Sequence, residues 1–177
     1  MGMKMTPRAM IRAADARDAA SLAALGMQVW LHTYATTGVS AVIAEYVLAE
    51  LTPGKFLGLI DDPEASLFVA EIEGHLVGYI VVRYGADSPE ADSNVEIETL
   101  YVQEHFLRLG IGTALLRRAQ AETKRRTGSG RICLTVNIYN ANAIAFYKRH
   151  GFVHAGTAYF ALGAEKHENH VLVCQDV

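Results

Sequence analysis

The sequence predicts an α+β fold in which a mixed β-sheet carries helices on both faces. Three observations lead to this prediction. Apolar residues recur at helical spacing through the first third of the chain, two β-rich runs joined by a Glu73-Gly74 turn follow, and helix-like and strand-like segments then alternate to the end. This order of elements is typical of a sheet covered by helices, and not of an all-helical or an all-β protein.

The first third of the chain predicts three helices after a short apolar start at residues 11–13. Asp15 and Asp18 suit a helix N-terminus, where side-chain oxygens cap free amides and carboxylates favour the dipole. Ser40 can cap the second helix, and Thr52-Pro53-Gly54 interrupts the pattern before a third, shorter helix. The apolar face of the first helix consists of Leu22, Leu25, Met27, Val29 and Trp30.

Strand-like runs appear from residue 66 onward. The polar stretch of residues 85–94 contains Pro89 and is expected to be a loop. Gly151 is placed as the C-terminal cap of the last helix. The predicted strands are residues 66–73, 76–84, 95–102 and 131–138 with a closing hairpin of 152–162 and 170–173, and the later helices are 110–127 and 141–150.

Length and composition favour a single domain, expected at residues 8–177 behind a flexible N-terminus at residues 1–7. Of the 177 residues, 51% are hydrophobic, which allows a sizeable core without disulfides or metals. The net charge of -3 argues against a nucleic-acid partner. No apolar run approaches the roughly 18 residues of a membrane span, so no membrane partner is expected.

Cysteine and histidine usage predicts neither a disulfide framework nor a metal site. Cys133 and Cys174 lie far apart, each in an apolar run, which fits a reducing cytoplasm. The 7 histidines show no His-x-x-x-His or His-Glu-x-x-His spacing. His167 and His170 are expected to be exposed near a polar turn.

A glycine-containing loop between a strand and an apolar helix carries the most chemical information. Gly110 and Gly112 stand at the helix start, where the first amides lack partners and the dipole favours an anion. A pyrophosphate site is one interpretation, and a helix start without a ligand is the other. Leu115 replaces the third glycine of the dinucleotide fingerprint, no acid follows near residue 130, and the Gly-Lys-Ser/Thr of a P-loop is absent.

Two segments resemble the signatures of the GNAT superfamily of N-acetyltransferases. Residues 100–116 are similar to the acetyl-CoA signature Gln/Arg-x-x-Gly-x-Gly/Ala, with Leu107 in place of the usual Gln or Arg and Arg108 beside it. The second signature is matched by Asn140, Ala143, Phe146, Tyr147, Gly151 and Phe152. The resemblance extends from about residue 8 to the end, and it is closest to bacterial spermidine/spermine acetyltransferases.

This resemblance implies a fold and a cosubstrate. The sheet should be splayed where the strand ending at Val102 parts from the strand beginning near Arg131, and acetyl-CoA would enter there without a metal. The pyrophosphate would contact the amides between Arg108 and Thr113. The residues implied to bind acetyl-CoA are Leu100, Tyr101, Val102, Leu107, Arg108, Leu109, Gly110, Ile111, Gly112, Thr113 and Asn140.

The resemblance also implies which residues move protons. Tyr147 matches a tyrosine near the CoA sulfur, and a phenol with a pKa of about 10 can donate to a leaving thiolate. Its alternative role is helix packing. Glu98 matches the general base, and Glu96 is the reserve candidate on the same strand face, where two carboxylates can raise one pKa. An exposed polar strand face is the alternative for both.

The acceptor is expected to be a small-molecule or peptide amine. Between Tyr84 and Leu107 there is no Lys or Arg, and the segment carries Asp87, Glu90, Asp92, Glu96, Glu98 and Glu104. An acidic approach concentrates cationic substrates, which favours a polyamine, although a solvated acidic loop explains it equally. A peptide α-amine and an aminoglycoside are alternative acceptors. A non-catalytic CoA-binding sensor is the alternative function, and a homodimer is left open.

Overall fold

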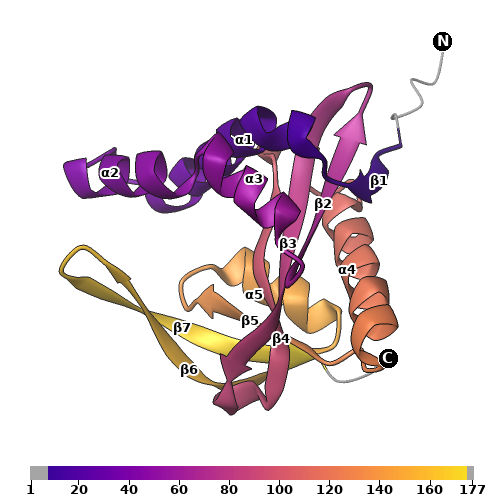
Figure 1. Cartoon of the computed structure of the whole chain (residues 1–177). Coiled ribbons are helices and arrows are strands. Elements are labelled where there is room, and N and C mark those ends of the chain that lie inside the picture. Colours follow the sequence, from indigo (N-terminus) through magenta and orange to yellow (C-terminus); the bar gives the residue numbers. More distant parts are fainter. Residues whose placement is uncertain (1–7, 175–177) are drawn as a thin grey trace, which may run out of the picture.

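The computed structural model describes residues 8–174, so the expected flexible N-terminus at residues 1–7 lies outside the described residues. The strands form one seven-stranded sheet in the order β1-β2-β3-β4-β5-β7-β6 (Figure 1). Only β4 and β5 pair in parallel, so the sheet is mixed, as predicted. The strands are β1 (Met10–Ala13), β2 (Ala65–Ile72), β3 (His75–Ser88), β4 (Ser93–Val102), β5 (Ile132–Asn137), β6 (Phe152–Leu162) and β7 (Glu165–Cys174).

Helices cover both faces of the sheet, which confirms the predicted architecture. α1 (Ala19–Tyr34) and α3 (Pro53–Asp61) pack on one face, and α4 (Ile111–Thr127) and α5 (Ala141–Arg149) on the other (Figure 1). α2 (Ala41–Glu50) extends beyond the sheet towards the β6–β7 hairpin. Short 3-10 turns occupy Ala16–Asp18, Pro89–Ala91 and Glu104–Phe106. No helix among residues 8–174 has the length and apolarity needed to span a bilayer.

Alternation along β3 divides the core into two layers. Tyr79 and Val81 face α1 and α3, whereas Ile80 and Val82 face α4. All four side chains are at most 2% exposed, which identifies β3 as a central strand buried on both faces.

Local capping accounts for the helix starts that the sequence predicts. Ser40 Oγ accepts a bond from the Ile43 amide at 3.3 Å, and Thr52 Oγ1 accepts one from Lys55 at 3.2 Å. Gly151 adopts φ +83° directly after α5, as a C-terminal glycine does.

Two boundary predictions were wrong, and hydrogen bonding between strands is the reason. β3 continues to Ser88 and pairs with Ser93, so residues 85–94 form the polar end of a hairpin and not a loop. β7 begins at Glu165 instead of residue 170, because its polar residues pair with β6. Cross-strand pairing stabilised segments whose composition favoured a loop.

The sheet splits between β4 and β5, as expected. The two strands share a single residue pair, Glu96 with Cys133. Beyond Glu96, β4 remains paired with β3 up to Val102 on its other edge. The free edge of β4 therefore presents backbone amides and carbonyls without a neighbouring strand, and it leads to the start of α4.

Candidate functional site

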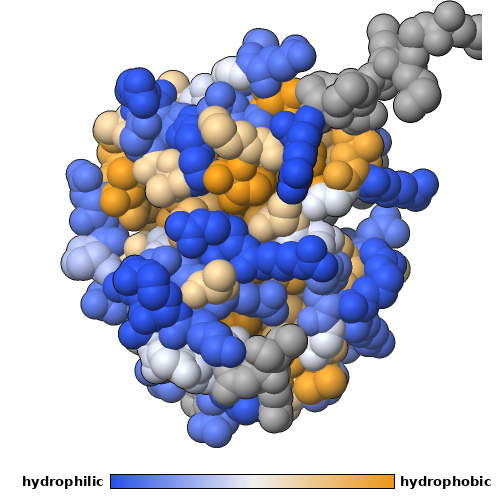
Figure 2. Space-filling model, turned by 90° about the vertical axis from the view of Figure 1, so that its right-hand side faces the viewer, coloured by the Kyte–Doolittle hydropathy of each residue, from blue (hydrophilic) through white to orange (hydrophobic). Residues whose placement is uncertain are grey.

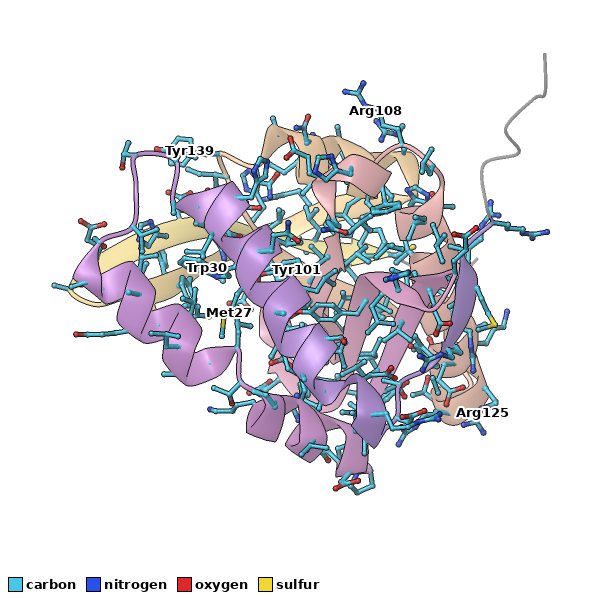
Figure 3. All side chains as sticks on the ribbon, turned by 90° about the horizontal axis from the view of Figure 1, so that it is seen from above. Met27, Trp30, Tyr101, Arg108, Arg125 and Tyr139 are labelled. Atoms are coloured by element: carbon cyan, nitrogen blue, oxygen red, sulfur yellow. The ribbon has the colours of Figure 1, made fainter. Side chains whose placement is uncertain are left out.

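The loop between β4 and α4 presents the backbone as an anion site requires. Arg108 and Gly110 both have positive φ, +64° and +78°, and no side chain caps the helix. The first bond within α4 runs from the Ala114 amide to the Gly110 carbonyl at 3.0 Å, so the amides of residues 111–113 are left without helical partners. Arg108 projects outward at the rim of the molecule (Figure 3).

Gly112 has a packing role that the sequence analysis did not foresee. A Cβ at this position would lie 3.3 Å from the ring of Phe146. Glycine therefore allows the start of α4 to approach α5 closely, and not only a ligand to approach the backbone.

His150 joins the same two elements. Its Nδ1 donates to the Phe146 carbonyl at 2.8 Å, and its Nε2 lies 3.0 Å from the Thr113 hydroxyl. Because a carbonyl oxygen only accepts, the neutral ring must accept from Thr113. Asn140 Oδ1, at the other end of α5, accepts from the Ala143 amide at 3.2 Å.

Tyr147 is buried in the core cluster that includes Ile97 of β4 and Val136 of β5. Its side chain packs against Phe146 and Phe152, with ring centroids 5.3 Å apart in both pairs, and it is 8% exposed. Burial raises the pKa of its phenol well above the ordinary value. The hydroxyl therefore remains protonated throughout the neutral range. Tyr147 therefore packs α5 against the core, and this position is compatible with a role as a proton donor.

A β-bulge places Glu98 apart from the regular alternation of β4. Thr99 pairs with Val81 and Ile97 with Val82, which leaves Glu98 as the extra residue. Its carboxylate accepts a bond from Arg83 Nε at 2.7 Å, and Arg83 Nη1 also lies 2.6 Å from Asp62. Glu98 is thus held by a cation.

Glu96 has different surroundings, although it lies only two positions earlier. It faces Arg83 in the register of β3 and β4 and Cys133 in the single pair of β4 and β5. It makes no ion pair with any residue in the range 8–174. Burial raises the pKa of Glu96, and the neighbouring Glu98 carboxylate adds to the effect.

Two tyrosines, Tyr46 and Tyr79, lie near Glu98 on the α1 side of the sheet. Tyr101 of β4 packs edge-on against Tyr79 at 5.6 Å, and Figure 3 shows Tyr101 beneath α1 and Trp30 between α1 and α2. Burial raises the pKa of Tyr101 well above its ordinary value, and nearby phenols, including that of Tyr147, contribute to this. Helical spacing had suggested only core packing for Trp30, and nothing in the sequence distinguished Tyr101 from its neighbours.

The described part of the chain contains no cluster of side chains that could hold a metal ion. No set of three or more His, Cys, Asp or Glu side chains among residues 8–174 is arranged to hold an ion. His167 and His170 are half-buried on β7 and not exposed near a turn, because β7 extends through both. Cys133 and Cys174 are buried free thiols.

Comparison with known proteins decides the family. The model of the acetyltransferase (GNAT) family matches residues 29–152, a range that includes the glycine loop, Glu96, Glu98 and Tyr147. The chain belongs to the GNAT acetyltransferase family. It is accordingly an acetyl-CoA-dependent N-acetyltransferase.

Relatives of this acetyltransferase come from bacteria and archaea. An N-acetyltransferase of Mycobacterium tuberculosis is 33% identical over 131 residues, which cover 74% of this chain and 80% of the relative. An N-alpha-acetyltransferase of Sulfurisphaera tokodaii is 35% identical over 103 residues, which cover 55% of this chain and 62% of the relative.

Solved structures share the fold. The PaiA N-acetyltransferase of Thermoplasma acidophilum, crystallised with coenzyme A, superimposes with a TM-score of 0.77 at 20% identity, covering 94% of this chain and 98% of that one. At this identity the likeness concerns the arrangement of helices and strands.

Proposed function

We propose that this acetyltransferase acetylates a primary amine whose neighbouring groups are cationic, with a polyamine as the first candidate. The observation that carries the proposal is the separation of β4 and β5 after the Glu96–Cys133 pair. The free edge of β4 and the uncapped start of α4 follow this separation along the chain, and Tyr147 is buried in the core cluster that β4 and β5 share. Acetyl-CoA bound there would have its thioester between the carboxylates of β4 and the phenol of α5.

The backbone supports this position for acetyl-CoA. Leu100, Tyr101 and Val102 pair with β3 on one edge and have no strand on the other, so the peptide groups that point away from β3 are free to bond to an extended ligand. The pyrophosphate would lie on the amides between Arg108 and Thr113, at the positive end of the helix dipole. Arg108, next to the position where the signature usually has Gln or Arg, would supply a cation near the phosphates, and the Asn140 side chain caps the start of α5.

The proton transfers follow from the reaction. The amine nitrogen forms a bond to the carbonyl carbon as the carbon–sulfur bond breaks, so one proton leaves the nitrogen and the departing thiolate can accept another. Tyr147, protonated because it is buried, is the proposed donor to the sulfur. A carboxylate on β4 is the proposed acceptor of the amine proton, directly or through water.

Between the two carboxylates, we favour Glu96 over Glu98 as the base. Glu98 is engaged by Arg83 at 2.7 Å, so its carboxylate already has a cationic partner. Glu96 has no such partner among the described residues, its pKa is raised, and it lies where the strands part. Glu98 then contributes negative charge that attracts a cationic amine.

A peptide α-amine is the strongest competing acceptor, because the relative from Sulfurisphaera tokodaii is an N-alpha-acetyltransferase. The polyamine interpretation rests instead on the acidic segment between Tyr84 and Leu107. A non-catalytic sensor would need neither Tyr147 nor a free carboxylate. The buried thiols suit a reducing cytoplasm, and a homodimer remains a prediction.

Release of free thiol from acetyl-CoA tests the proposal. Purified protein should acetylate 1,5-diaminopentane or spermidine in preference to an alanyl peptide or an aminoglycoside. Tyr147→Phe should keep acetyl-CoA affinity, measured by calorimetry, and lose about 10²–10⁴-fold in kcat if proton donation limits the rate. Binding of acetyl-CoA without thiol release for any amine would instead support the sensor.

A further inference from the structure

Four aromatic side chains from three different elements gather on the α1 side of the sheet, within electrostatic reach of Glu98 on β4. Trp30 and Tyr34 belong to α1, Tyr46 to α2 and Phe160 to β6. Trp30 lies 4.9 Å from both tyrosine rings, and Tyr46 meets Phe160 edge-on at 5.8 Å. The β6–β7 hairpin and α2 therefore meet through aromatic rings, although they are far apart in the chain.

The four rings differ in burial in an informative way. Trp30 is 5% exposed, whereas Tyr34 is 41% and Phe160 37% exposed. Trp30 packs against both tyrosines, and each of them stands at the edge of this group of rings. Tyr34, Tyr46 and Phe160 consequently keep ring surface that no other described residue covers completely. Large rings held in this way favour a ligand that interacts with π-faces.

Charge specifies the kind of ligand. Burial raises the pKa of the Tyr46 phenol, and the carboxylates of Glu50 and Glu98 are among the neighbours that raise it further. The Glu98 carboxylate also contributes to the raised pKa of Tyr79, whose side chain lies on the same face of the sheet. The rings are therefore near negative charge, and α2 itself carries Glu45 and Glu50. Aromatic faces and carboxylates both attract ammonium groups, whereas they repel carboxylates and phosphates.

We propose that Tyr34, Tyr46 and Phe160 bind a second, non-reacting ammonium group of the acceptor amine and thereby select dications over monocations. This proposal rests on the proposed acetyl transfer at the split between β4 and β5 and specifies its substrate class. The reacting nitrogen lies at the carboxylates of β4, and the distal ammonium lies against the rings. No covalent step occurs at the aromatic site.

A competing explanation is that the rings only attach α2 to the hairpin. The Val42 side chain would lie 3.1 Å from a Cβ at Gly163, so the two elements already touch at the hairpin tip. A purely structural role would make Tyr46 and Phe160 important for stability and equally important for all amines. The two roles therefore differ in whether their loss changes selectivity.

The test compares 1,5-diaminopentane with pentylamine, which has the same chain and a single nitrogen. Steady-state thiol release at saturating acetyl-CoA gives kcat/KM for each amine. We expect the diamine to be preferred about 5- to 30-fold, the range of a cation–π contact that is partly desolvated. Tyr46→Leu and Phe160→Leu should reduce this ratio to near one, chiefly through a higher KM for the diamine.

Two further variants separate recognition from packing. Tyr46→Phe keeps the ring and should keep the preference. Tyr159→Leu removes a 66% exposed ring from the opposite face of the same strand and should leave the ratio as in the wild type. An unchanged ratio in both leucine variants, or equal kcat/KM for the two amines in the wild type, would overturn the proposal.

A binding measurement distinguishes this failure from failure of the proposed function. Calorimetric titration of 1,5-diaminopentane into the protein with CoA requires no turnover. Weaker binding to Tyr46→Leu than to Tyr159→Leu, without acetylation of any amine, would support the cation site and refute the reaction. Acetylation of amines with identical diamine binding in all variants would support the reaction and refute the cation site.

Discussion

Two arginines in this acetyltransferase each lie between two carboxylates, and their surroundings give them different roles. Arg12 of β1 contacts Asp18 at 2.7 Å and Glu71 of β2 at 2.8 Å. Arg83 of β3 contacts Asp62 at 2.6 Å and Glu98 of β4 at 2.7 Å. The first cluster joins β1 to its neighbours at the edge of the sheet, and the second lies at the bulge beside the split.

The two clusters differ in how far their carboxylates are buried, and a further carboxylate without a cation, Glu96, lies beside the second cluster. The Asp18 side chain is 10% exposed, and the hydrogen bond from Arg12 holds the pKa of its carboxyl below the ordinary value. The Glu98 side chain is 45% exposed, and Glu96 lies nearby with a raised pKa and no cation of its own. The same ionic motif thus pairs the carboxylates around Arg12 within the fold, whereas beside Arg83 it leaves one carboxylate, Glu96, without a cation, and this is the carboxylate that we propose as the proton acceptor.

The largest effect should come from the unpaired carboxylate. Glu96→Gln keeps the size of the side chain but cannot accept a proton, so kcat should fall about 10²–10⁴-fold at neutral pH. Activity should partly return towards pH 10, where more of the amine is already neutral. Steady-state rates from pH 6 to 10 measure this. Glu98→Gln is the matched control and should mainly raise KM; a larger loss of kcat for Glu98→Gln would make Glu98 the base.

Removal of the first arginine should affect stability and not catalysis. Arg12→Ala leaves Asp18 buried beside Glu71 without its cation, which should lower the free energy of unfolding by about 1–3 kcal/mol. Urea denaturation at pH 7 measures the loss. Arg17→Ala, which removes a 90% exposed side chain from its pair with Asp15, should leave the free energy of unfolding almost unchanged, because water screens an exposed ion pair.

The Arg12 effect should depend on pH in a defined direction. The folded-state pKa of Asp18 is lowered, so its ion pair contributes above the ordinary carboxyl value of 3.8 and is lost as the pH falls through the folded-state pKa. The difference between wild type and Arg12→Ala should therefore shrink in strong acid. A constant difference from pH 7 to pH 2 would contradict the assigned cause.

Removal of the second arginine should shift a pH profile and barely affect the fold. Without its cation, Glu98 repels a neighbouring charge more strongly, so Arg83→Met should raise the pKa of Glu96 further and move the acidic limb of kcat/KM to higher pH. The pair is partly exposed, so stability should change by less than about 1 kcal/mol. Arg83→Lys should restore most of the wild-type profile. If the acidic limb of the kcat/KM profile did not shift, Arg83 would have no influence on the catalytic carboxylate.

The smallest expected effect is a gain of stability. Because the folded-state pKa of Glu96 is raised, the folded protein binds its proton more tightly, and stability falls as the pH rises from the unfolded to the folded pKa. Glu96→Gln should therefore be slightly more stable than the wild type at pH 8 and equally stable at pH 4. Thermal unfolding at both values measures the difference, and a destabilised variant at pH 8 would count against the raised pKa.

The family and most of the fold follow from local features of the sequence. The signature residues occur at fixed spacings, among them the glycines of the loop between β4 and α4, Asn140 and Tyr147. Caps such as Ser40 act within a few residues. Both kinds of feature can therefore be recognised without tertiary structure. Polar strand ends were predicted less well. Ser88 and Glu165 lie in strands only because a partner strand forms hydrogen bonds with them.

Long-range contacts decided the chemistry of the site. Period-two spacing puts Glu96 and Glu98 on one face, but the bulge, and the contact of Arg83 with Glu98, give them different surroundings. The aromatic rings of α1, α2 and β6 come together through packing across more than half the chain. The sequence alone determined the family of this protein, and with it the type of reaction, because the family's motifs are local. Only the tertiary structure decided which carboxylate is unpaired, because charge, burial and ring contacts depend on residues distant in sequence.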